Sequence, residues 1–519
     1  MATIILDFQN CFIFIVLCLF SLFSYRFFFK KPKDVPPGYD LPPSPPSLPF
    51  IGHLHLLLSV QPYKSFQKLF STYGPLLYLR VFNAPFLLVS SASVAYEMYK
   101  THDVNLVSHG TLGIDESLLS GSSSFVMAPY GPYWKFLKKL MVTKMLGPQA
   151  LERSRGIRAK ELARFHAILL HKAKNNESVE IGLEAMKLTN NIICRISMGT
   201  TFSEENGEAE RLRGLVTESF SLVKKIVLRV ILRKPLEKLG ISPFKKEIMG
   251  VSQRFDDLLE KILREHEEKL DEHQGTDMMD ALLTAYQDTN AEYRITRNQM
   301  KAFLVDLLTA GTDTTAQAMQ WTMAEILNNR NILERLREEM ESVDGKTRLV
   351  QETDLPNLPF LQAVVKEGLR LHPPIPLLPR VFEEGCKIRG FYVPAETPVL
   401  VNAYAVMRDP EYWERPCEFL PERFLAPLRS GQEDERKEQA LKFLPFAGGR
   451  RACPASNLAQ TSIVTAIGTM VQGFDWIVEG DKVHLEEGSG LMTMSMARPL
   501  MCTPVARSQY FTTDLQDGT

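Results

Sequence analysis

One of the seven cysteines, Cys453, lies in a loop rich in glycine and arginine, which reads KFLPFAGGRRACPASNLAQ from Lys442 to Gln460. Gly448 and Gly449 would let the backbone approach a flat ligand closely. Successive amides, the adjacent arginines and the start of a following helix would stabilise an anionic sulfur, which Phe446 could shield. A thiolate held in this way suits an axial ligand of haem iron, where it favours O–O cleavage. The alternative is a buried structural cysteine.

A second group of reactive side chains interrupts a long apolar helical pattern, LVDLLTAGTDTTAQAMQWTMAEIL, at Leu304–Leu327. Ala310 and Gly311 are small, so a ligand could lie close to the backbone there. Asp313 and Thr314 need partners or water on an otherwise buried surface. A threonine that competes for a helical carbonyl bends the helix, and these groups could pass protons from solvent to an iron-bound oxygen. Alternatively, a new helix begins at Asp313 and the aspartate is its N-cap.

A charged pair lies further along the chain in KEGLRLHPP, where Glu367 and Arg370 are spaced i, i+3 on a helix that the prolines end. Arg423, in RPCEFLPERF, is a candidate third partner. A buried network of these three groups would be a structural clamp and not a catalyst. Taken alone, the pair would be an ordinary surface ion pair.

Trp134 and Lys138 share one face of a predicted helix within YGPYWKFLKKL, at Tyr130–Leu140. Both side chains are hydrogen-bond donors and are suited to a carboxylate. An exposed helix surface is the alternative interpretation.

The elements that must position these groups are mostly helices. GPLLYLRVFNAPFLLVSS at Gly74–Ser91 alternates as a hairpin does, residues 92–340 have mainly helical period, and short strands return beyond about residue 375. RFDDLLEKILREHEEKLDEH predicts an amphipathic helix with a solvated face. Helices first and strands later, without βαβ alternation, predict one large, mainly α body of the α+β class.

Composition limits the kind of protein. The 519 residues carry 60 Lys+Arg against 61 Asp+Glu, for a net charge of −1, which does not support binding to nucleic acid. The cysteines are scattered without a CxxC pair, which argues against a disulfide scaffold and a structural zinc site.

The amino terminus predicts an uncleaved membrane anchor, with a cleaved signal peptide or a buried core helix as the alternatives. CFIFIVLCLFSLFSY contains no charge, and lysines follow it, so the positive-inside rule places the body in the cytosol. A proline-rich run, DVPPGYDLPPSPPSLPFIG, comes next and is either a stiff polyproline II spacer or a plain linker. KKIVLRVILRKPLEKLG, at Lys224–Gly240, either dips into a membrane surface or packs on the core.

Together these motifs resemble the cytochrome P-450 superfamily of haem-thiolate monooxygenases. The family's pattern F-x-x-G-x-R-x-C-x-G falls on Phe446, Gly449, Arg451 and Cys453, with Ala455 in place of the last glycine. Its oxygen-activation pattern falls on Ala310, Gly311, Asp313, Thr314 and Thr315, and its E-x-x-R pair on Glu367 and Arg370. The resemblance implies that the haem propionates are held by Trp134, Lys138, Arg380 and Arg451.

The resemblance implies a single helix-rich haem-thiolate monooxygenase fold with small sheets at 53–505. It follows a membrane anchor at 1–29 and a hinge at 30–52, and precedes a tail at 506–519. It also implies haem b as cofactor, Cys453 as the iron ligand, and Asp313 and Thr314 as catalytic residues. NADPH-cytochrome P-450 reductase would supply electrons, with O2 and a lipophilic plant metabolite as substrates. A single-pass protein of the endoplasmic reticulum is expected, with its catalytic domain in the cytosol.

The substrate pocket follows from family position and is mostly apolar, which favours a triterpenoid over a flavonoid. Its candidates are Ile114, Leu118, Phe303, Leu307, Ala310, Ile375, Leu377, Leu378, Leu491, Met492 and Thr493. The reductase would dock on basic residues of the cysteine side, namely Lys135, Lys139, Lys442 and Arg450. Two other functions compete: a haem-thiolate isomerase or dehydratase that does not use O2, and a non-catalytic membrane haem binder.

Overall fold

The computed structural model of the chain describes Ile15, Cys18 and residues 36–507, except for 83, 111–116, 120, 201, 203–206, 238–240, 269–276, 289, 291–292, 345–347, 426–441, 481 and 491–492. Apart from Ile15 and Cys18, the predicted anchor lies outside these residues, as do Ile114, Leu491, Met492 and the tail from residue 508. In the part of the chain that is described, no helix combines the length and apolar character needed to cross a bilayer.

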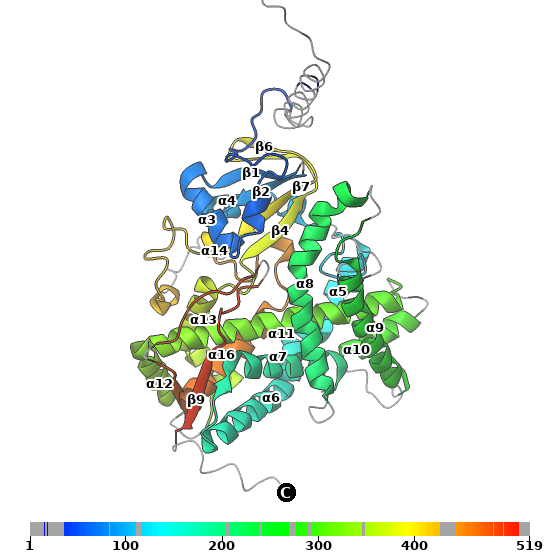
Figure 1. Ribbon diagram of the computed structural model, residues 1–519. Coiled ribbons are helices and arrows are strands. Elements are labelled where there is room, and N and C mark those ends of the chain that lie inside the picture. Colours follow the sequence, from blue (N-terminus) through cyan, green and yellow to red (C-terminus); the bar gives the residue numbers. More distant parts are fainter. Residues whose placement is uncertain are drawn as a thin grey trace, which may run out of the picture.

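A four-stranded sheet joins the early and late parts of the chain (Figure 1). Strands β1 (Leu76–Val81) and β2 (Ala84–Val89) form the predicted hairpin, with Leu77 opposite Leu88. Strand β7 (Thr397–Asn402) pairs parallel to β2 and antiparallel to β4 (Leu377–Phe382). Both strands are among those predicted beyond residue 375. The sheet therefore brings Arg380 on β4 toward elements that precede it by about three hundred residues.

Helices make up most of the rest of the molecule and confirm the helical period of residues 92–340. Figure 1 shows most of them below the sheet, with α11 running through the centre and with α3 and α4 beside the sheet. Their bounds are α3 Pro62–Tyr73, α4 Ala92–Thr101, α5 Pro132–Met141, α6 Pro148–Lys174, α7 Ile181–Met198, α8 Glu208–Glu237, α9 Lys245–Glu268, α10 Met278–Gln287, α11 Arg297–Asn328, α12 Arg330–Asp344, α13 Pro359–Leu371 and α16 Ser456–Gly473.

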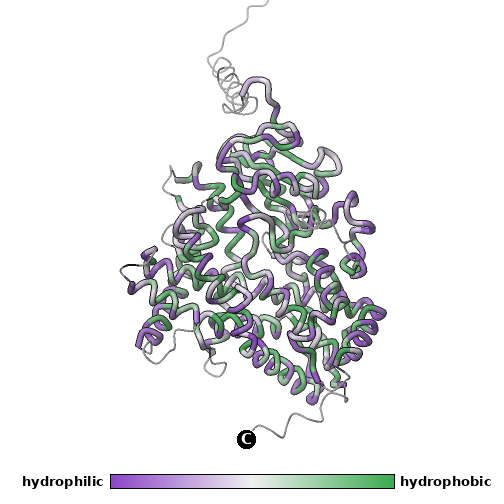
Figure 2. Tube along the Cα trace, turned by 180° about the vertical axis from the view of Figure 1, so that it is seen from behind, coloured by the Kyte–Doolittle hydropathy of each residue, from purple (hydrophilic) through white to green (hydrophobic). Residues whose placement is uncertain are grey.

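Two small sheets complete the α+β architecture. The first contains β3, β9 and β8, and the second pairs β5 with β6. Their bounds are β3 Val179–Glu180, β8 Phe474–Val478, β9 Met501–Ala506, β5 Cys386–Ile388 and β6 Phe391–Val393. Along the outer helices in Figure 2, hydrophilic and hydrophobic residues alternate within each turn, as expected for helices that bury one face.

Helix α11 is the central element. Thr296 caps it in a reciprocal pair with Gln299, and most of its residues are buried on all sides, from Met300 to Ile326. The helix continues through Asp313 without a break. The alternative in which a new helix begins at Asp313 is therefore wrong.

The proline-rich segment lies against the body from Pro36 onward. The backbone amide of Tyr78 donates to the Pro43 carbonyl at 2.8 Å, and that of Tyr392 donates to Asp40 at 2.9 Å. Because Tyr78 belongs to β1 and Tyr392 to β6, this segment is fixed to two sheets over its described length.

Glu367, Arg370 and Arg423 form the predicted clamp. Arg370 donates to both carboxylate oxygens of Glu367 at 2.7 and 2.8 Å, and Arg423 donates to the same carboxylate at 3.2 Å. The first two side chains are completely buried. Arg370 also donates to the carbonyls of Met407 and Pro416. The clamp therefore joins α13 to the segments that lead to the cysteine loop.

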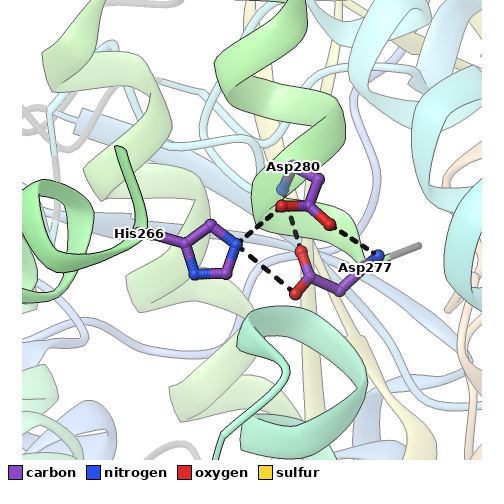
Figure 3. Close-up of side chains that lie close together, drawn as sticks. All are labelled: His266, Asp277 and Asp280. Carbon is purple, nitrogen blue, oxygen red and sulfur yellow. Dashed lines mark hydrogen bonds and ion pairs between the residues drawn. The ribbon is translucent and has the colours of Figure 1, made fainter. Parts of the chain in front are cut away.

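A second buried cluster joins α9 to α10, where His266 faces Asp277 and Asp280 (Figure 3). The ring Nε2 of His266 lies 2.7 Å from Asp280 Oδ1 and 3.5 Å from Asp277 Oδ2. The other oxygen of Asp277 accepts the Asp280 amide at 2.8 Å and so caps α10. The hydrogen bond to Asp277, together with Asp280, raises the pKa of His266 above 6.5, although burial lowers it.

We expect His266→Gln to lower stability most at acidic pH. A raised folded-state pKa gives stabilisation that is fully present below the unfolded value of 6.5 and disappears as pH rises through the folded value. The loss should be roughly 1–3 kcal/mol near pH 6 and smaller near pH 9, measured as the difference in Tm from the unmodified chain at each pH. The exposed His171 on α6 provides the control, since His171→Gln should show little loss at either pH. A deficit that is independent of pH would contradict the charged pair.

Candidate active site

The cysteine loop folds back on itself just before α16. The amide of Cys453 donates to the Phe446 carbonyl at 2.9 Å, and α16 begins at Ser456. Two residues of this loop, Ala447 and Gly449, have positive φ. The Cys453 side chain is exposed, but it lines an internal cavity, so its exposed surface faces that cavity.

The electrostatics of the thiol differ from the sequence-based expectation. Burial raises the pKa of Cys453, and a backbone hydrogen bond at Ala455 opposes this. The two arginines are engaged elsewhere: Arg450 pairs with Asp103 at 3.1 Å, and Arg451 donates to the Val107 carbonyl at 2.6 Å. The loop alone thus leaves the sulfur protonated, and coordination to a metal ion would be needed to remove the proton.

The glycines of the loop serve packing. A Cβ on Gly448 would lie 3.0 Å from the Tyr99 ring, and a Cβ on Gly449 would lie 2.2 Å from Asp103 Oδ1. Gly449, predicted to bind the cofactor, lies outside the described cavity lining. The close approach that these two glycines allow is to Tyr99 on α4 and to Asp103 after it.

The cavity has a volume of about 450 Å³, within the range of small-molecule and cofactor sites. It brings together residues from the four sequence motifs and from β4. The predicted site residues that line it are Trp134, Lys138, Ala310, Gly311, Thr314, Arg380, Phe446, Arg451 and Cys453. Among the predicted catalytic pair, Thr314 lines the cavity and Asp313 does not.

The polar turn of α11 faces two directions. Thr314 Oγ1 donates to the Ala310 carbonyl at 2.5 Å, which is the competition for a helical carbonyl expected from the sequence. Asp313 is buried beside Gln317, whose amide nitrogen lies 3.3 Å from its carboxylate. Burial raises the pKa of Asp313. The aspartate therefore lies behind the cavity wall, in a place that favours a protonated carboxyl.

Cationic and N–H groups gather at one part of the wall. Arg451 Cζ lies 4.5 Å and Lys138 Nζ lies 4.7 Å from the centre of the Trp134 ring. The indole Nε1 of Trp134 and Nε of Arg380 are buried without a hydrogen-bond partner in the structure. Unpartnered buried donors require an acceptor. A cysteine sulfur and several donors suited to carboxylates, all on one cavity, fit a haem with two propionates.

His109 belongs to the same part of the wall and was not found from the sequence. Its Nε2 lies 2.7 Å from Arg380 Nη1, an obligatory donor, so this ring nitrogen is the acceptor. Burial, followed by the charges of Arg380 and Arg451, lowers the pKa of His109 well below its usual value, although the Val126 backbone opposes this shift. The imidazole is therefore neutral. A single histidine outside any motif gave no signal in the sequence.

The predicted substrate pocket is only partly the observed one. Phe303, Leu307, Ala310, Ile375 and Leu378 line the cavity, whereas Leu118, Leu377 and Thr493 are described but lie outside the lining. Helix α8 supplies a wall that the sequence analysis did not assign, formed by Ser219, Phe220, Val223 and Ile226. Of the Lys224–Gly240 segment, Ile226 alone is among these four residues, and the apolar helical spacing of Phe220, Val223 and Ile226 was the signal for this wall.

Asp306 on α11 is the second residue that sequence analysis missed. Its carboxylate accepts from Ser124 Oγ at 3.0 Å and from the Val126 amide at 3.3 Å. Burial raises the pKa of Asp306 to about 7, although these hydrogen bonds lower it. Phe125, between the two donors, stacks on Trp134 with ring centroids 5.6 Å apart. Asp306 therefore fixes the loop that carries Phe125 into the cavity wall.

A cavity between a cysteine loop and the small residues Ala310 and Gly311 of α11, with carboxylate-binding groups at its edge, is the site of a cysteine-ligated haem protein. The family model described as Cytochrome P450 matches residues 42–502, and the chain belongs to this family. Membership carries the cofactor, haem b, and the class of enzyme, a cytochrome P450 monooxygenase.

The chain is similar to curated plant proteins along nearly its whole length. It is 64% identical to cytochrome P450 705A22 of Arabidopsis thaliana, over 98% of this chain and 99% of that protein. It is 37% identical to 3,9-dihydroxypterocarpan 6A-monooxygenase of Glycine max, over 96% of this chain and 99% of that protein.

Solved structures share the fold. A zebra fish cytochrome P450 with abiraterone has a TM-score of 0.71 and 24% identity, and covers 86% of this chain and 100% of its own. A zebra fish cytochrome P450 with progesterone has a TM-score of 0.71 and 25% identity, and covers 86% of this chain and 99% of its own. These likenesses match the helix-rich architecture described above.

Proposed function

We propose that this monooxygenase oxidises a lipophilic plant metabolite, a triterpenoid in preference to a flavonoid, by hydroxylation or desaturation. One observation carries the proposal: Cys453 and the Thr314 turn of α11 line one internal cavity whose walls are mostly apolar. A sulfur ligand and a hydroxyl that face the same cavity are what oxidation of an unactivated carbon requires.

Different side chains of the cavity have separate roles in this reaction. Bound haem supplies the iron at which O2 is reduced. Cys453 Sγ holds that iron, while Trp134 Nε1 and Arg380 Nε are free to donate to the propionates. Thr314 directs its hydroxyl hydrogen to the Ala310 carbonyl, which leaves the oxygen lone pairs to accept a hydrogen bond from a group in the cavity. Asp313, from behind the wall, is suited to hold a proton.

The choice of substrate class rests on how the wall hydroxyls are used. Ser219 donates to Leu215 at 2.7 Å and Thr309 to Val305 at 2.7 Å, each within its own helix. The Ser124 hydroxyl donates to Asp306. These three wall hydroxyls are thus already engaged, and burying the several hydroxyls of a flavonoid beside them would cost more than burying a hydrocarbon skeleton. The zebra fish relative with progesterone holds a rigid polycyclic ligand in the same fold.

The substrate class is tested by metabolite profiling. The chain would be co-expressed with a plant P450 reductase and supplied in parallel with candidate triterpenes and flavonoids. We expect new oxidised products from the triterpene arm. Products from the flavonoid arm alone would overturn the substrate class and leave the monooxygenase assignment intact.

The proposed function also includes a source of electrons and a location in the cell. An NADPH-cytochrome P-450 reductase would dock on the cysteine side, where Lys138 Nζ donates to the Arg450 carbonyl at 3.0 Å and so joins α5 to the loop. Lys135 and Lys139, on the same helix, and Lys442, before the loop, would add positive charge. We place the protein at the endoplasmic reticulum membrane, held by residues 1–29, with its catalytic domain in the cytosol.

Thr314→Ala should divert electrons to hydrogen peroxide. Without the Thr314 hydroxyl, each escaping O2 takes the two electrons of one NADPH and two protons and leaves as H2O2. The peroxide released per NADPH should rise at least roughly tenfold, while haem content and substrate affinity stay unchanged. Thr322 is the matched control because its hydroxyl makes the same bond, to Ala318 at 2.7 Å, on the same helix outside the cavity. A Thr314→Ala chain that behaves like the unmodified one would favour a non-catalytic haem binder.

A further inference from the structure

Helix α7 packs along α11 beside the polar turn Ala310–Thr314. Of the described cavity-lining residues, Ile193 alone belongs to α7. A Cβ on Gly311 would lie 2.8 Å from Ile193 Cδ1, so this side chain fills the space that the glycine leaves. Gly311 therefore makes room for a side chain of the neighbouring helix α7, whereas the sequence analysis expected it to make room for a ligand.

Two polar residues of α7, one turn before Ile193, contact the same part of α11. Thr189 Oγ1 lies 2.9 Å from the Thr312 carbonyl, which is slightly nearer than the Ala185 carbonyl of its own helix at 3.0 Å. Asn190 Nδ2 donates to the Thr312 hydroxyl at 3.3 Å. All three side chains are buried, and Thr312 is 0% exposed. Asn190 also lies 3.8 Å from the Cys194 thiol, which donates to its carbonyl oxygen. The contacts to Thr312 are therefore shielded from bulk solvent.

These contacts hold the turn from the side opposite to its reactive group. On the cavity side, the Thr314 hydroxyl donates to the carbonyl of Ala310. On the α7 side, Thr189 takes the carbonyl of Thr312. A helix whose carbonyls are shared with side chains is locally easier to bend and rotate. The hydrogen bonds from α7 restrict that freedom and select one rotational setting of the turn.

We propose that Thr189 and Asn190 are positioning residues that keep the Ala310–Thr314 turn in the setting where Thr314 faces the cavity, and thereby couple electron use to substrate oxidation. The inference rests on the proposed function for its catalytic consequence, whereas its structural half concerns α7 and α11 alone.

Adjacent asparagines on α7 give a matched test. Asn190 faces α11, whereas Asn191 faces α6, where it donates to Glu161 at 3.1 Å. Both are buried amides of identical size, so Asn190→Ala and Asn191→Ala remove the same atoms from the same helix. The full-length chain carrying haem would be compared by hydrogen exchange of the α11 amides and by peroxide released per NADPH with reductase present.

We expect Asn190→Ala to speed exchange of the amides around Thr312 and to raise the peroxide ratio, each by roughly two- to tenfold, as loss of one buried hydrogen bond implies. Asn191→Ala should change neither quantity, even where it lowers Tm. Thr189→Val should act like Asn190→Ala, and Thr189→Ser, which keeps the hydroxyl, should restore the normal values.

Equal effects of the Asn190→Ala and Asn191→Ala variants would overturn the proposal, because a general loss of packing would then explain both. Failure of Thr189→Ser to rescue would do the same. If the unmodified chain used no NADPH with O2, reductase and substrate, the proposed function would fail instead, and the exchange measurements would still decide whether α7 sets the turn.

Discussion

Replacing Cys453 with histidine is expected to abolish the red-shifted Soret band that a thiolate-ligated haem gives in its reduced carbon monoxide complex. Imidazole is a neutral ligand and does not supply the electron density of a thiolate, so product formation should fall by more than ~100-fold even where haem is retained. The change is local, since the Cys453 side chain is exposed to the cavity and a histidine can extend into it.

Cys502 is the matched control for this substitution. It is a free cysteine buried on β9, away from the cavity lining, so Cys502→Ala should keep the band with at most a loss of stability. A Cys453→His chain that still showed the thiolate band would require another cysteine as ligand, and the site described here would be wrong.

Glu367→Leu is expected to prevent most of the chain from folding with haem. The substitution leaves the fully buried Arg370 without its carboxylate, and removing one partner from a buried ion pair costs roughly 3–5 kcal/mol. Arg423 and the Leu420 amide, which also bind this carboxylate, lose their partner at the same time. The measurements are the haem incorporated per chain and the Tm of the soluble fraction, and both should fall sharply.

An exposed pair on another helix gives the control. Glu334 and Arg330 have side chains that are 60% and 88% exposed, so Glu334→Leu should cost less than about 1 kcal/mol and leave haem content unchanged. Equal losses from Glu367→Leu and Glu334→Leu would show that burial of the clamp contributes nothing beyond a surface ion pair.

Local spacing explains why two side-chain contacts on the helices could be predicted from the sequence. Glu367 and Arg370 meet because residues three apart share a helix face, and Thr314 bonds to Ala310 because residues four apart do. Cys453 follows from the composition of a single loop. Each of these inferences uses contacts within a few residues, which helical geometry determines before the chain folds.

Parts that depended on distant segments were missed or misjudged. Gly449 allows close packing of Asp103, which lies more than three hundred positions earlier, and Gly311 makes room for Ile193 on another helix. His109 acquires its role only because β4 brings Arg380 to it, and α8 becomes a cavity wall only when it crosses α11.

The sequence by itself determined the pairing of Glu367 with Arg370 and made Cys453 and Thr314 the candidates for iron ligation and proton transfer, because these inferences use residue types and short helical spacings. Tertiary structure alone decided which way each group faces: Thr314 into the cavity, Asp313 behind its wall, and Arg450 toward Asp103. The physical reason is that orientation is set by the side chains packed against each group, and these come from segments that only folding brings together.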